Sequence, residues 1–400
     1  MPDSPIKIAL LGTGIYSESD YLPSLLKETQ DHSDVKTVWS LDASAAERFA
    51  VQFQAAGRAQ PQIAVGDAGI EEIINDAEID AVVIVLPFAH QPPLIKRFWA
   101  AGKHVLSEKP IERDVKAGLA LVKEFDENWK SKNLVWRVAE DYDHEPIHRR
   151  AAELLADPAM GPVLFWDLQN QNYCPDGDKW QSTTWRNVPD YQGGFCLDGG
   201  VHSIAMLRVI LPDPPAAVVS SASLHRKHTP PHDTILALVL PASSATKEPS
   251  GSTTKLDINR LQAAKLPEPG KSTPAGTITF TWALPDIEPR PPKELQVLNI
   301  TCLNGKLTLI NDSGTRILEV SPANGSRVKA VKETSAKKGV EVELAYFARA
   351  VQATKAGRAV DPAEDYGTPI NTVWDVAVIQ AMLQSNGNKV DIQQLIDQYK

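Results

Sequence analysis

The chain has 400 residues, of which 42% are hydrophobic and 23% are charged, and its net charge is −9. This length is sufficient for two domains with substantial hydrophobic cores. The acidic balance and the lack of a basic run argue against a nucleic-acid surface, since phosphate binding needs clustered lysine and arginine. No apolar run is long enough to span a bilayer, so we expect no membrane partner.

The N-terminal sequence reaches an apolar run at Ile6 without the basic segment and apolar stretch of a secretory signal. The three cysteines are unevenly spaced, which favours unpaired thiols in a reducing compartment over a disulfide. We therefore expect a cytoplasmic protein. No Cys/His cluster has the spacing of a zinc site, so we also expect no metal.

Short apolar runs alternate with helical patterns in the first third of the chain. The predicted strands are 6–11, 35–41, 64–65, 79–86, 104–106 and 134–139, and the predicted helices are 19–29, 43–55, 70–75, 93–101 and 115–130. This alternation is typical of parallel strands joined by right-handed helical crossovers. It predicts an α/β domain over residues 1–141.

After about residue 142, strands follow one another with few intervening helices. The predicted strands are 162–172, 218–224, 234–240, 276–284, 295–303, 306–310 and 315–320, and the predicted helices are 146–156, 201–211, 340–355, 368–385 and 392–400. Successive strands without crossovers indicate an antiparallel sheet, so residues 142–400 are predicted to form an α+β domain. Residues 241–275 are rich in Ser, Thr, Pro and Lys, which predicts a mobile insertion, either a passive loop or an interaction segment.

The first predicted strand ends in a glycine-rich turn with the dinucleotide fingerprint, Gly12-Thr13-Gly14-Ile15-Tyr16-Ser17. Gly12 permits a tight turn, and Gly14 lets the backbone approach a pyrophosphate that the following helix N-terminus attracts. After the second strand, Asp42 either bonds the adenosine ribose of NAD or caps the next helix. No arginine stands there for the 2′-phosphate of NADP, so NAD is slightly favoured and NADP stays open.

Two runs carry groups suited to proton transfer. Ser107-Glu108-Lys109-Pro110 follows a strand, where an open α/β sheet places reactive groups; the alternative is a solvated turn. Asp198 and His202 are four residues apart, which puts both side chains on one helical face if the helix begins early enough. A helix cap for Asp198 and a core position for His202 are the alternatives. Lys109, Asp198 and His202 come from two domains, as is usual for a site at a domain interface.

These motifs together resemble those of the Gfo/Idh/MocA oxidoreductases. The residues that match are Gly12-Thr13-Gly14, Ala101-Gly102-Lys103-His104-Val105, Glu108-Lys109-Pro110, Gly193-Gly194, Asp198, Gly200 and His202. Gln91 and the run from Trp185-Arg186 to Gly194 are similar to a fungal-type branch of that family. The resemblance implies a Rossmann domain and a C-terminal domain with a large, mostly antiparallel open sheet. It also implies NAD(P)-dependent redox chemistry on a sugar, cyclitol or related carbinol.

The resemblance further implies a role for each site residue. Lys109 would touch the substrate oxygen and the nicotinamide ribose, Asp198 would orient the substrate, and His202 would be the general acid/base. A cis peptide bond would precede Pro110. In the mechanism that we expect, Glu108 keeps Lys109 cationic so that Lys109 can stabilise the alkoxide. The cofactor would lie along Gly12, Thr13, Gly14, Ile15, Tyr16, Asp42, Leu86, Pro87, Glu108, Lys109 and Pro110.

Two departures from the family pattern bear on specificity, and Arg186 is a further candidate contact. Leu86-Pro87-Phe88-Ala89-His90-Gln91 stands where the family often has Thr-Pro-Asn followed by His, so His90 or Gln91 is expected to take the polar contact. Arg186 either contacts substrate or cofactor or forms a surface ion pair. Residues 141–146 replace a stretch that is usually more basic.

The leading functional prediction is reversible hydride transfer between nicotinamide and a small polyol or carbonyl substrate. One alternative is a non-catalytic dinucleotide-binding sensor or transcriptional co-regulator, since a yeast repressor of the galactose regulon resembles this family. Another is redox-assisted elimination of glycosides. The resemblance also implies a homodimer or homotetramer formed through the C-terminal sheet, with strand 218–224 or strand 295–303 at the interface.

Overall fold

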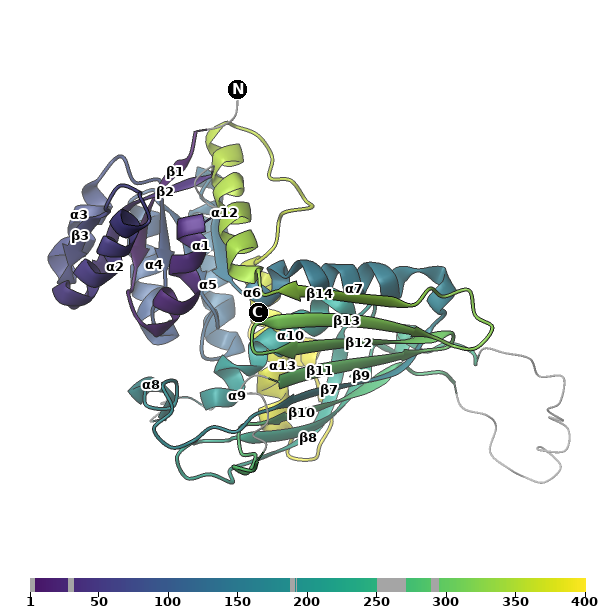
Figure 1. Ribbon diagram of the computed structural model, residues 1–400. Helices are drawn as coiled ribbons and strands as arrows, with labels where there is room; N and C mark the ends of the chain where they lie inside the picture. The colour runs from purple at the N-terminus through teal and green to yellow at the C-terminus, as the bar shows by residue number, and fades with distance from the viewer. Residues whose placement is uncertain (1–3, 28–31, 188–190, 192, 250–270, 289–294) are drawn as a thin grey trace, which may run out of the picture.

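The computed structural model describes residues 4–27, 32–187, 191, 193–249, 271–288 and 295–400. The described residues form two β-sheets, one parallel and one mostly antiparallel, and helices pack against each sheet (Figure 1). Residues 28 and 29 of the first predicted helix and residues 250–270 of the predicted insertion lie outside the described residues. The two described ends of that insertion pair with each other through a bridge between Lys247 and Ser272.

A six-stranded parallel sheet forms the N-terminal layer, in the order β3-β2-β1-β4-β5-β6. Its strands are β1 (Ile6–Leu11), β2 (Ser33–Ser40), β3 (Gln62–Val65), β4 (Ala81–Ile84), β5 (His104–Glu108) and β6 (Trp136–Ala139). This is the Rossmann strand order, and the prediction of a Rossmann domain is confirmed. The order reverses between β1 and β4, and sheets of this kind bind dinucleotides at that switch point.

Helices cover both faces of the parallel sheet. They are η1 (Ser17–Tyr21, a π-helical segment), α1 (Leu22–Lys27), α2 (Ala43–Ala55), α3 (Gly66–Asn75), η3 (Phe88–His90), α4 (Gln91–Ala100), α5 (Val115–Asn128) and η4 (Lys130–Lys132). Along β1, Ile8 and Leu10 belong to one hydrophobic core and Ala9 and Leu11 to another. Because strand side chains alternate between faces, this split shows that both faces of the sheet are buried.

A helix from the far end of the sequence completes the N-terminal layer. α12 (Gly339–Lys355) packs against β1, and its Leu344 and Phe347 share a core with Ile8. Figure 1 shows this helix standing beside the parallel sheet. The predicted division at residue 141 placed α12 with the second domain; that division stays a prediction.

Nine strands form the second sheet, in the order β14-β13-β12-β11-β7-β10-β9-β8-β15. They are β7 (Val163–Gln171), β8 (Pro215–Ser223), β9 (Thr234–Pro241), β10 (Ala275–Thr281), β11 (Leu295–Cys302), β12 (Gly305–Asp312), β13 (Thr315–Pro322), β14 (Val331–Ala336) and β15 (Val390–Asp391). Among these described strands only β7 and β10 pair in parallel, so the predicted, mostly antiparallel sheet is confirmed. β14 has no buried residue and β15 has two residues, which is why neither produced an apolar pattern.

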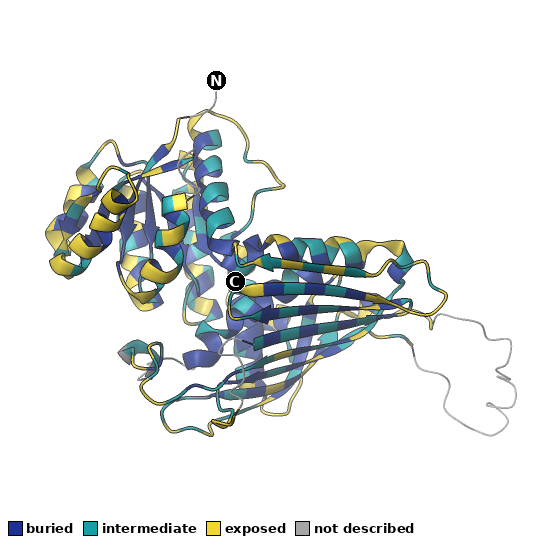
Figure 2. Ribbon diagram, viewed as in Figure 1, coloured by how far each residue is buried: buried dark blue, intermediate teal, exposed yellow. Residues whose placement is uncertain are grey.

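Helices pack on one face of this second sheet, and none of the helices described covers the other face. The helices of this region are α6 (Asp141–His144), α7 (Pro146–Ala156), η5 (Pro158–Met160), α8 (Thr184–Asn187), α9 (Gly194–Asp198), α10 (Gly200–Ile210), η6 (Ser243–Ala245), α13 (Pro369–Ser385) and α14 (Ile392–Asp397). Burial alternates along the strands (Figure 2), as a sheet covered on one side requires. None of the helices described reaches the length and hydropathy needed to cross a bilayer.

Candidate active site

The glycine loop between β1 and η1 has the geometry of a dinucleotide cradle. Gly12 has a φ of +105°, and a Cβ at this position would lie 2.2 Å from the carbonyl oxygen of Val85. Ser17 stands where the fingerprint usually has a third glycine, and its hydroxyl donates to the Gly12 carbonyl at 2.8 Å. Gly14 faces open space, since a Cβ added to it would meet no heavy atom within 4 Å. The loop therefore leaves backbone accessible where a pyrophosphate would approach.

Two buried polar atoms beside this loop have no hydrogen-bond partner among the described residues. They are the Thr13 hydroxyl and the Gln91 Oε1. The Gln91 amide donates to the Leu86 carbonyl at 2.9 Å and to the Glu108 carbonyl at 3.1 Å, so it joins the chain after β4 to the end of β5. His90 is exposed. The open space at the loop and these unpaired polar atoms fit NAD or NADP.

The other predicted cofactor contacts surround the glycine loop. Ile15 is exposed, Pro87 is half-buried, and the Tyr16 ring packs edge-on against Tyr21 with centroids 5.7 Å apart. Asp42 caps α2, because its carboxylate accepts from the Ser44 backbone N–H at 2.9 Å. The cap is therefore formed, and an additional contact of Asp42 with a ribose stays a prediction.

Lys109 and Asp198 meet at the boundary between the two sheets. The Lys109 ammonium donates to the Asp198 carbonyl at 2.8 Å and to its carboxylate at 3.0 Å. The peptide bond before Pro110 is cis, as the family resemblance implied. The Arg186 Nε donates to the other carboxylate oxygen of Asp198 at 2.8 Å. All three side chains are at most 13% exposed, so neither a solvated turn at Lys109 nor a surface ion pair at Arg186 describes this cluster.

The charge balance of the cluster fixes Asp198 as a carboxylate. Burial alone would raise the pKa of Asp198, but the charges of Lys109 and Arg186 lower it well below its ordinary value. Two aromatic rings hold Arg186 in turn: its guanidinium lies 3.9 Å from the Trp185 ring centroid and 5.2 Å from that of Trp180. Because two cations, Lys109 and Arg186, surround the single carboxylate of Asp198, the cluster carries a net positive charge.

Glu108 has a different partner from the one expected. The Tyr21 hydroxyl donates to the Glu108 carboxyl at 2.6 Å, and the ion pair of Lys109 is with Asp198. Burial raises the pKa of Glu108 to about 8, although the nearby charge of Lys109 lowers it in part. In the structure the ion pair of Lys109 is with Asp198, and the role expected for Glu108 beside Lys109 stays a prediction.

The raised pKa of Glu108 predicts a pH-dependent loss of stability. The pKa is about 8 in the folded chain and 4.5 ordinarily, so the folded state binds more protons than the unfolded state between these values. Stability should therefore fall as pH rises from about 5 to 8. In Glu108→Gln this fall should be smaller, and the variant should gain a few kcal/mol relative to the wild type over that range. Urea unfolding of both proteins at pH 5 and pH 8 measures this, and parallel pH dependences would contradict it.

His202 lies in the first turn of α10 beside two acidic residues that sequence reasoning did not assign. Its Nδ1 is 2.6 Å from a carboxylate oxygen of Glu140 and 3.3 Å from one of Asp141. The ring of Tyr142 stacks on the imidazole, with centroids 4.9 Å apart and planes inclined by 27°. Glu140 follows β6 at the edge where the parallel strands end, and that position is the signal that could have identified it. Asp198 and His202 thus have separate sets of partners.

The acidic groups around His202 have a lysine beside them. His202, Glu140 and Asp141 offer ligand atoms within 4.8 Å of one another, a spacing that a metal ion could bridge. The Lys337 ammonium lies 3.1 Å from Asp141 and 2.9 Å from Asp20. Burial would raise the pKa of Asp141, but Lys337 and His202 lower it below its usual range. A cation is already present next to these carboxylates, and the absence of a metal stays a prediction.

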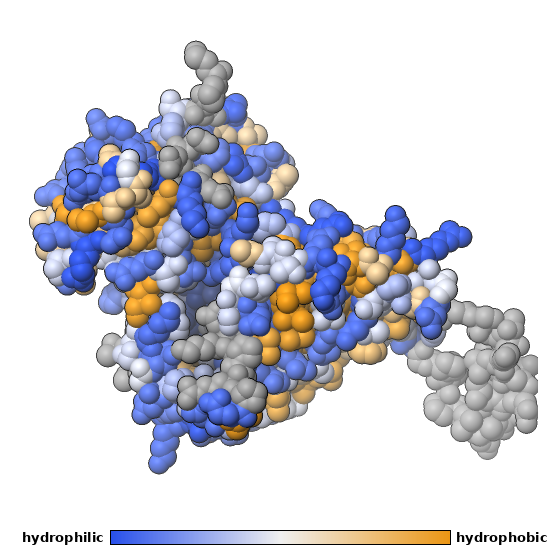
Figure 3. Space-filling view, viewed as in Figure 1, coloured by the Kyte–Doolittle hydropathy of each residue, from blue (hydrophilic) through white to orange (hydrophobic). Residues whose placement is uncertain are grey.

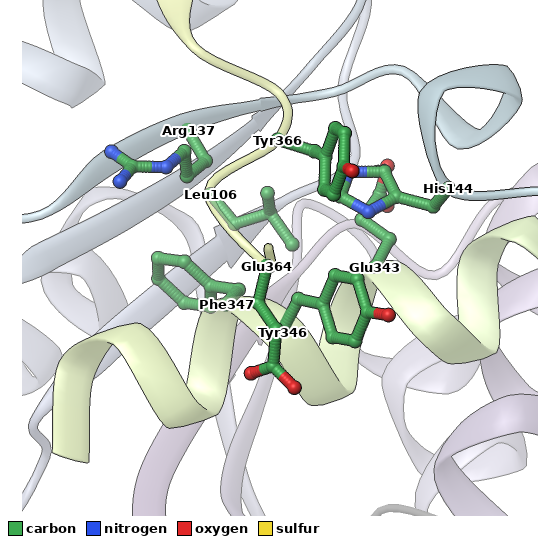
Figure 4. Close-up of a pocket in the computed structure, with 8 residues that line it drawn as sticks. All are labelled: Leu106, Arg137, His144, Glu343, Tyr346, Phe347, Glu364 and Tyr366. Atoms are coloured by element: carbon green, nitrogen blue, oxygen red, sulfur yellow. The ribbon is translucent and has the colours of Figure 1, made fainter. Parts of the chain in front are cut away.

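A small pocket lies between α12 and the strands β5 and β6 (Figure 4). None of the predicted site residues lines it. Its lining residues are Leu106, Arg137, His144, Glu343, Tyr346, Phe347, Glu364 and Tyr366. Both carboxyl oxygens of Glu343 are buried without a hydrogen bond, and burial raises its pKa well above the ordinary value. Burial without a hydrogen bond therefore disfavours the charged form of Glu343.

Two family models match the chain. Residues 6–133 match the oxidoreductase family with an NAD-binding Rossmann fold, and residues 148–253 match the GFO/IDH/MocA C-terminal domain. The chain belongs to the Gfo/Idh/MocA family. The predicted family is confirmed, and with it the class of NAD(P)-binding oxidoreductases.

Curated relatives and solved structures agree with this family. Dehydrogenase FPY6 of Fusarium mangiferae is 33% identical over 58% of this chain and 67% of its own length, consistent with a fungal-type branch. An oxidoreductase from Thermotoga maritima has a TM-score of 0.73 at 24% identity, covering 98% of this chain and 99% of that one. An inositol dehydrogenase homologue from Azotobacter vinelandii, solved with NADH and myo-inositol, has a TM-score of 0.68 at 18% identity, covering 97% and 98%. Because these two solved structures are only 24% and 18% identical to the chain, the likeness to them establishes the shared fold alone.

Proposed function

We propose that this protein transfers a hydride reversibly between nicotinamide and a carbinol or carbonyl carbon of a sugar, cyclitol or related small molecule. The observation that carries the proposal is the contact of Lys109, at the end of β5, with Asp198 of the second layer. This contact joins a cation, at the edge of the parallel sheet where the cofactor is expected, to a carboxylate that can orient a hydroxyl group of the substrate. The myo-inositol bound to the Azotobacter homologue is one example of such a substrate class.

The dinucleotide would be held by the glycine loop from Gly12 to Gly14 and by the chain around Leu86 and Pro87. The unpaired acceptor of Gln91 is the group best suited to the polar contact that the family usually makes nearby. When bound, the nicotinamide supplies the hydride donor or acceptor. The protein supplies the position, the charge and the proton transfer.

Residues of the chain itself would stabilise the developing charge and transfer the proton. The Lys109 ammonium stabilises the negative charge that develops on the substrate oxygen, since it is fixed in place by Asp198. During oxidation, the imidazole of His202 accepts the proton that leaves the hydroxyl group; during reduction, the imidazolium returns it. Arg186 keeps Asp198 ionised and limits its rotation.

A two-stage experiment tests this function. Fluorescence titration with NADH and NADPH establishes the preferred cofactor, and a panel of polyols, aldoses, ketoses and inositols is then screened at 340 nm. We expect tighter binding of NADH and turnover of at least one compound in the panel. Tight cofactor binding without turnover across the panel would instead favour the sensor or co-regulator alternative. A cytoplasmic location remains a further expectation.

We also propose that the open face of the nine-stranded sheet mediates homodimer formation. On this face Phe165, Leu236 and Leu238 are 55%, 55% and 45% exposed, and apolar side chains gather over the sheet (Figure 3). Exposed apolar groups gathered in this way are typical of protein interfaces. The predicted interface strands, β8 and β11, pair with neighbours on both sides, so they would contribute through this face and not as free edges.

Charged substitutions on the open face should therefore dissociate the oligomer. Combining Leu236→Lys with Leu238→Lys should convert a dimer to a monomer in sedimentation velocity, because buried ammonium groups would face each other across the interface. The matched control is Leu41→Lys, at a leucine 79% exposed next to β2. A wild-type monomer, or a double variant that remains dimeric, would contradict this interface.

A further inference from the structure

We infer that Glu140 is a positioning residue for His202: it keeps a proton on Nδ1 and so leaves Nε2 as the atom that exchanges a proton with the substrate. The inference rests on the proposed function for its catalytic consequence. Its structural part, the protonation pattern of one imidazole, can be tested without any substrate.

The contact between Glu140 and His202 is short and buried. The Oε1 atom of Glu140 lies 2.6 Å from Nδ1, and the Glu140 side chain is 1% exposed. The same oxygen accepts from the Tyr142 backbone N–H at 3.2 Å, which fixes the carboxylate at the start of α6. A carboxylate accepts hydrogen bonds, so in the inferred arrangement Glu140 accepts and Nδ1 donates the hydrogen of this contact.

Glu140, and not Asp141, is the residue that holds the proton on Nδ1. Asp141 lies farther from Nδ1, at 3.3 Å, and its other oxygen is 3.1 Å from the Lys337 ammonium. Tyr142 stacks on the imidazole and limits its rotation about χ2. The ring is therefore held by one hydrogen bond and one stacking contact, both from residues that closely follow β6.

Fixing Nδ1 as a donor determines what the other nitrogen can do. With Nδ1 protonated, neutral His202 has its acceptor lone pair on Nε2. The His202 side chain is 21% exposed although Glu140 is buried, so the imidazole is not sealed inside the protein. When Nε2 accepts the hydroxyl proton during oxidation, the Glu140 carboxylate stabilises the imidazolium that forms. Without that charge, the Nδ1-protonated tautomer is no longer favoured and the imidazolium is less stable.

Nitrogen-15 NMR of the histidine side chains tests the structural part. The full chain is labelled at all nine histidines, studied with NADH present, and the His202 signals are assigned by their loss in His202→Asn. We expect Nδ1 protonated and Nε2 unprotonated in neutral wild-type His202. We expect a mixture of the two tautomers in Glu140→Leu. A wild-type His202 protonated on Nε2, or a tautomer unchanged in Glu140→Leu, would overturn the inference.

Kinetics of an isosteric variant test the catalytic part. Glu140→Gln keeps an acceptor oxygen but removes the charge, so we expect kcat for oxidation to fall about 10²-fold. KM and NADH affinity should change little, and the acid limb of the pH profile should move to lower pH. The matched control is Glu343→Gln, which alters an equally buried carboxyl group on α12 and should leave kcat nearly unchanged.

The two measurements separate the two proposals. If wild-type protein turns over no compound, the proposed function fails, and the NMR result still decides the protonation pattern of His202. If turnover is present and Glu140→Gln retains full kcat and the wild-type pH profile, the positioning role fails while the function stands. An equal fall in kcat in Glu343→Gln would also overturn the positioning role of Glu140. Such a result would indicate that any buried amide in this region lowers kcat.

Discussion

Replacing Lys109 with methionine should lower turnover by about 10²- to 10³-fold, the range typical for removing one group that stabilises charge on a reacting oxygen. Methionine has a similar length and fills the same space, but it carries no charge and cannot donate to Asp198. The glycine loop and its open backbone are untouched, so NADH affinity should stay within a few-fold. Steady-state kinetics at 340 nm and fluorescence titration of NADH measure the two effects.

Lys103→Met is the matched control for this substitution. Lys103 lies six residues earlier, is 6% exposed, and donates to the carbonyls of Asp76 and Ile79 at 2.6 and 2.8 Å. Its loss should lower stability because the carbonyls of Asp76 and Ile79 each lose a hydrogen bond, while kcat of the folded enzyme should be retained. Substantial turnover in Lys109→Met would exclude Lys109 as the stabilising cation. Equal losses of kcat in both variants would point to misfolding.

The parallel sheet could be predicted because its strands are short, continuous and apolar. β4 consists of Ala81, Val82, Val83 and Ile84, all buried, and such a run between helical patterns has few alternatives. Sequence position also made Lys109 a candidate, because a charged residue directly after a strand of this kind lies at the edge where such sheets place reactive groups. Asp198 and His202 required the family resemblance, since four-residue spacing by itself equally describes a helix cap and a core histidine.

The partners of these residues could not be predicted because they come from distant parts of the sequence. Glu108 is adjacent to Lys109 in the chain, yet its carboxyl group bonds Tyr21, which the π-helical segment brings against β5. Lys337 precedes α12 and reaches Asp141 only because that helix packs against β1. Neighbouring charges in sequence suggested an ion pair, but burial and tertiary contacts determined the pairs that form.

Gly12→Ala should destabilise the fold more than any other single substitution in the glycine loop. The residue has a φ of +105°, which alanine rarely adopts, and the new Cβ would lie 2.2 Å from the Val85 carbonyl oxygen. Because that oxygen belongs to the backbone, no side-chain rotation can relieve the overlap. The turn would have to open, disturbing both the Ser17 hydrogen bond and the pairing of β1 with β4. We expect a loss of about 3 kcal/mol or more in the free energy of unfolding.

Gly14→Ala separates folding from cofactor binding at the same loop. A Cβ at Gly14 meets no heavy atom within 4 Å, so stability should change little. The added methyl group would nevertheless occupy the space through which the backbone approaches a pyrophosphate, so NADH affinity should fall at least tenfold. Urea unfolding and NADH titration of both variants provide the comparison. A stable Gly12→Ala protein would refute the steric account of this turn, and a Gly14→Ala protein with wild-type NADH affinity would remove the glycine loop from the cofactor site.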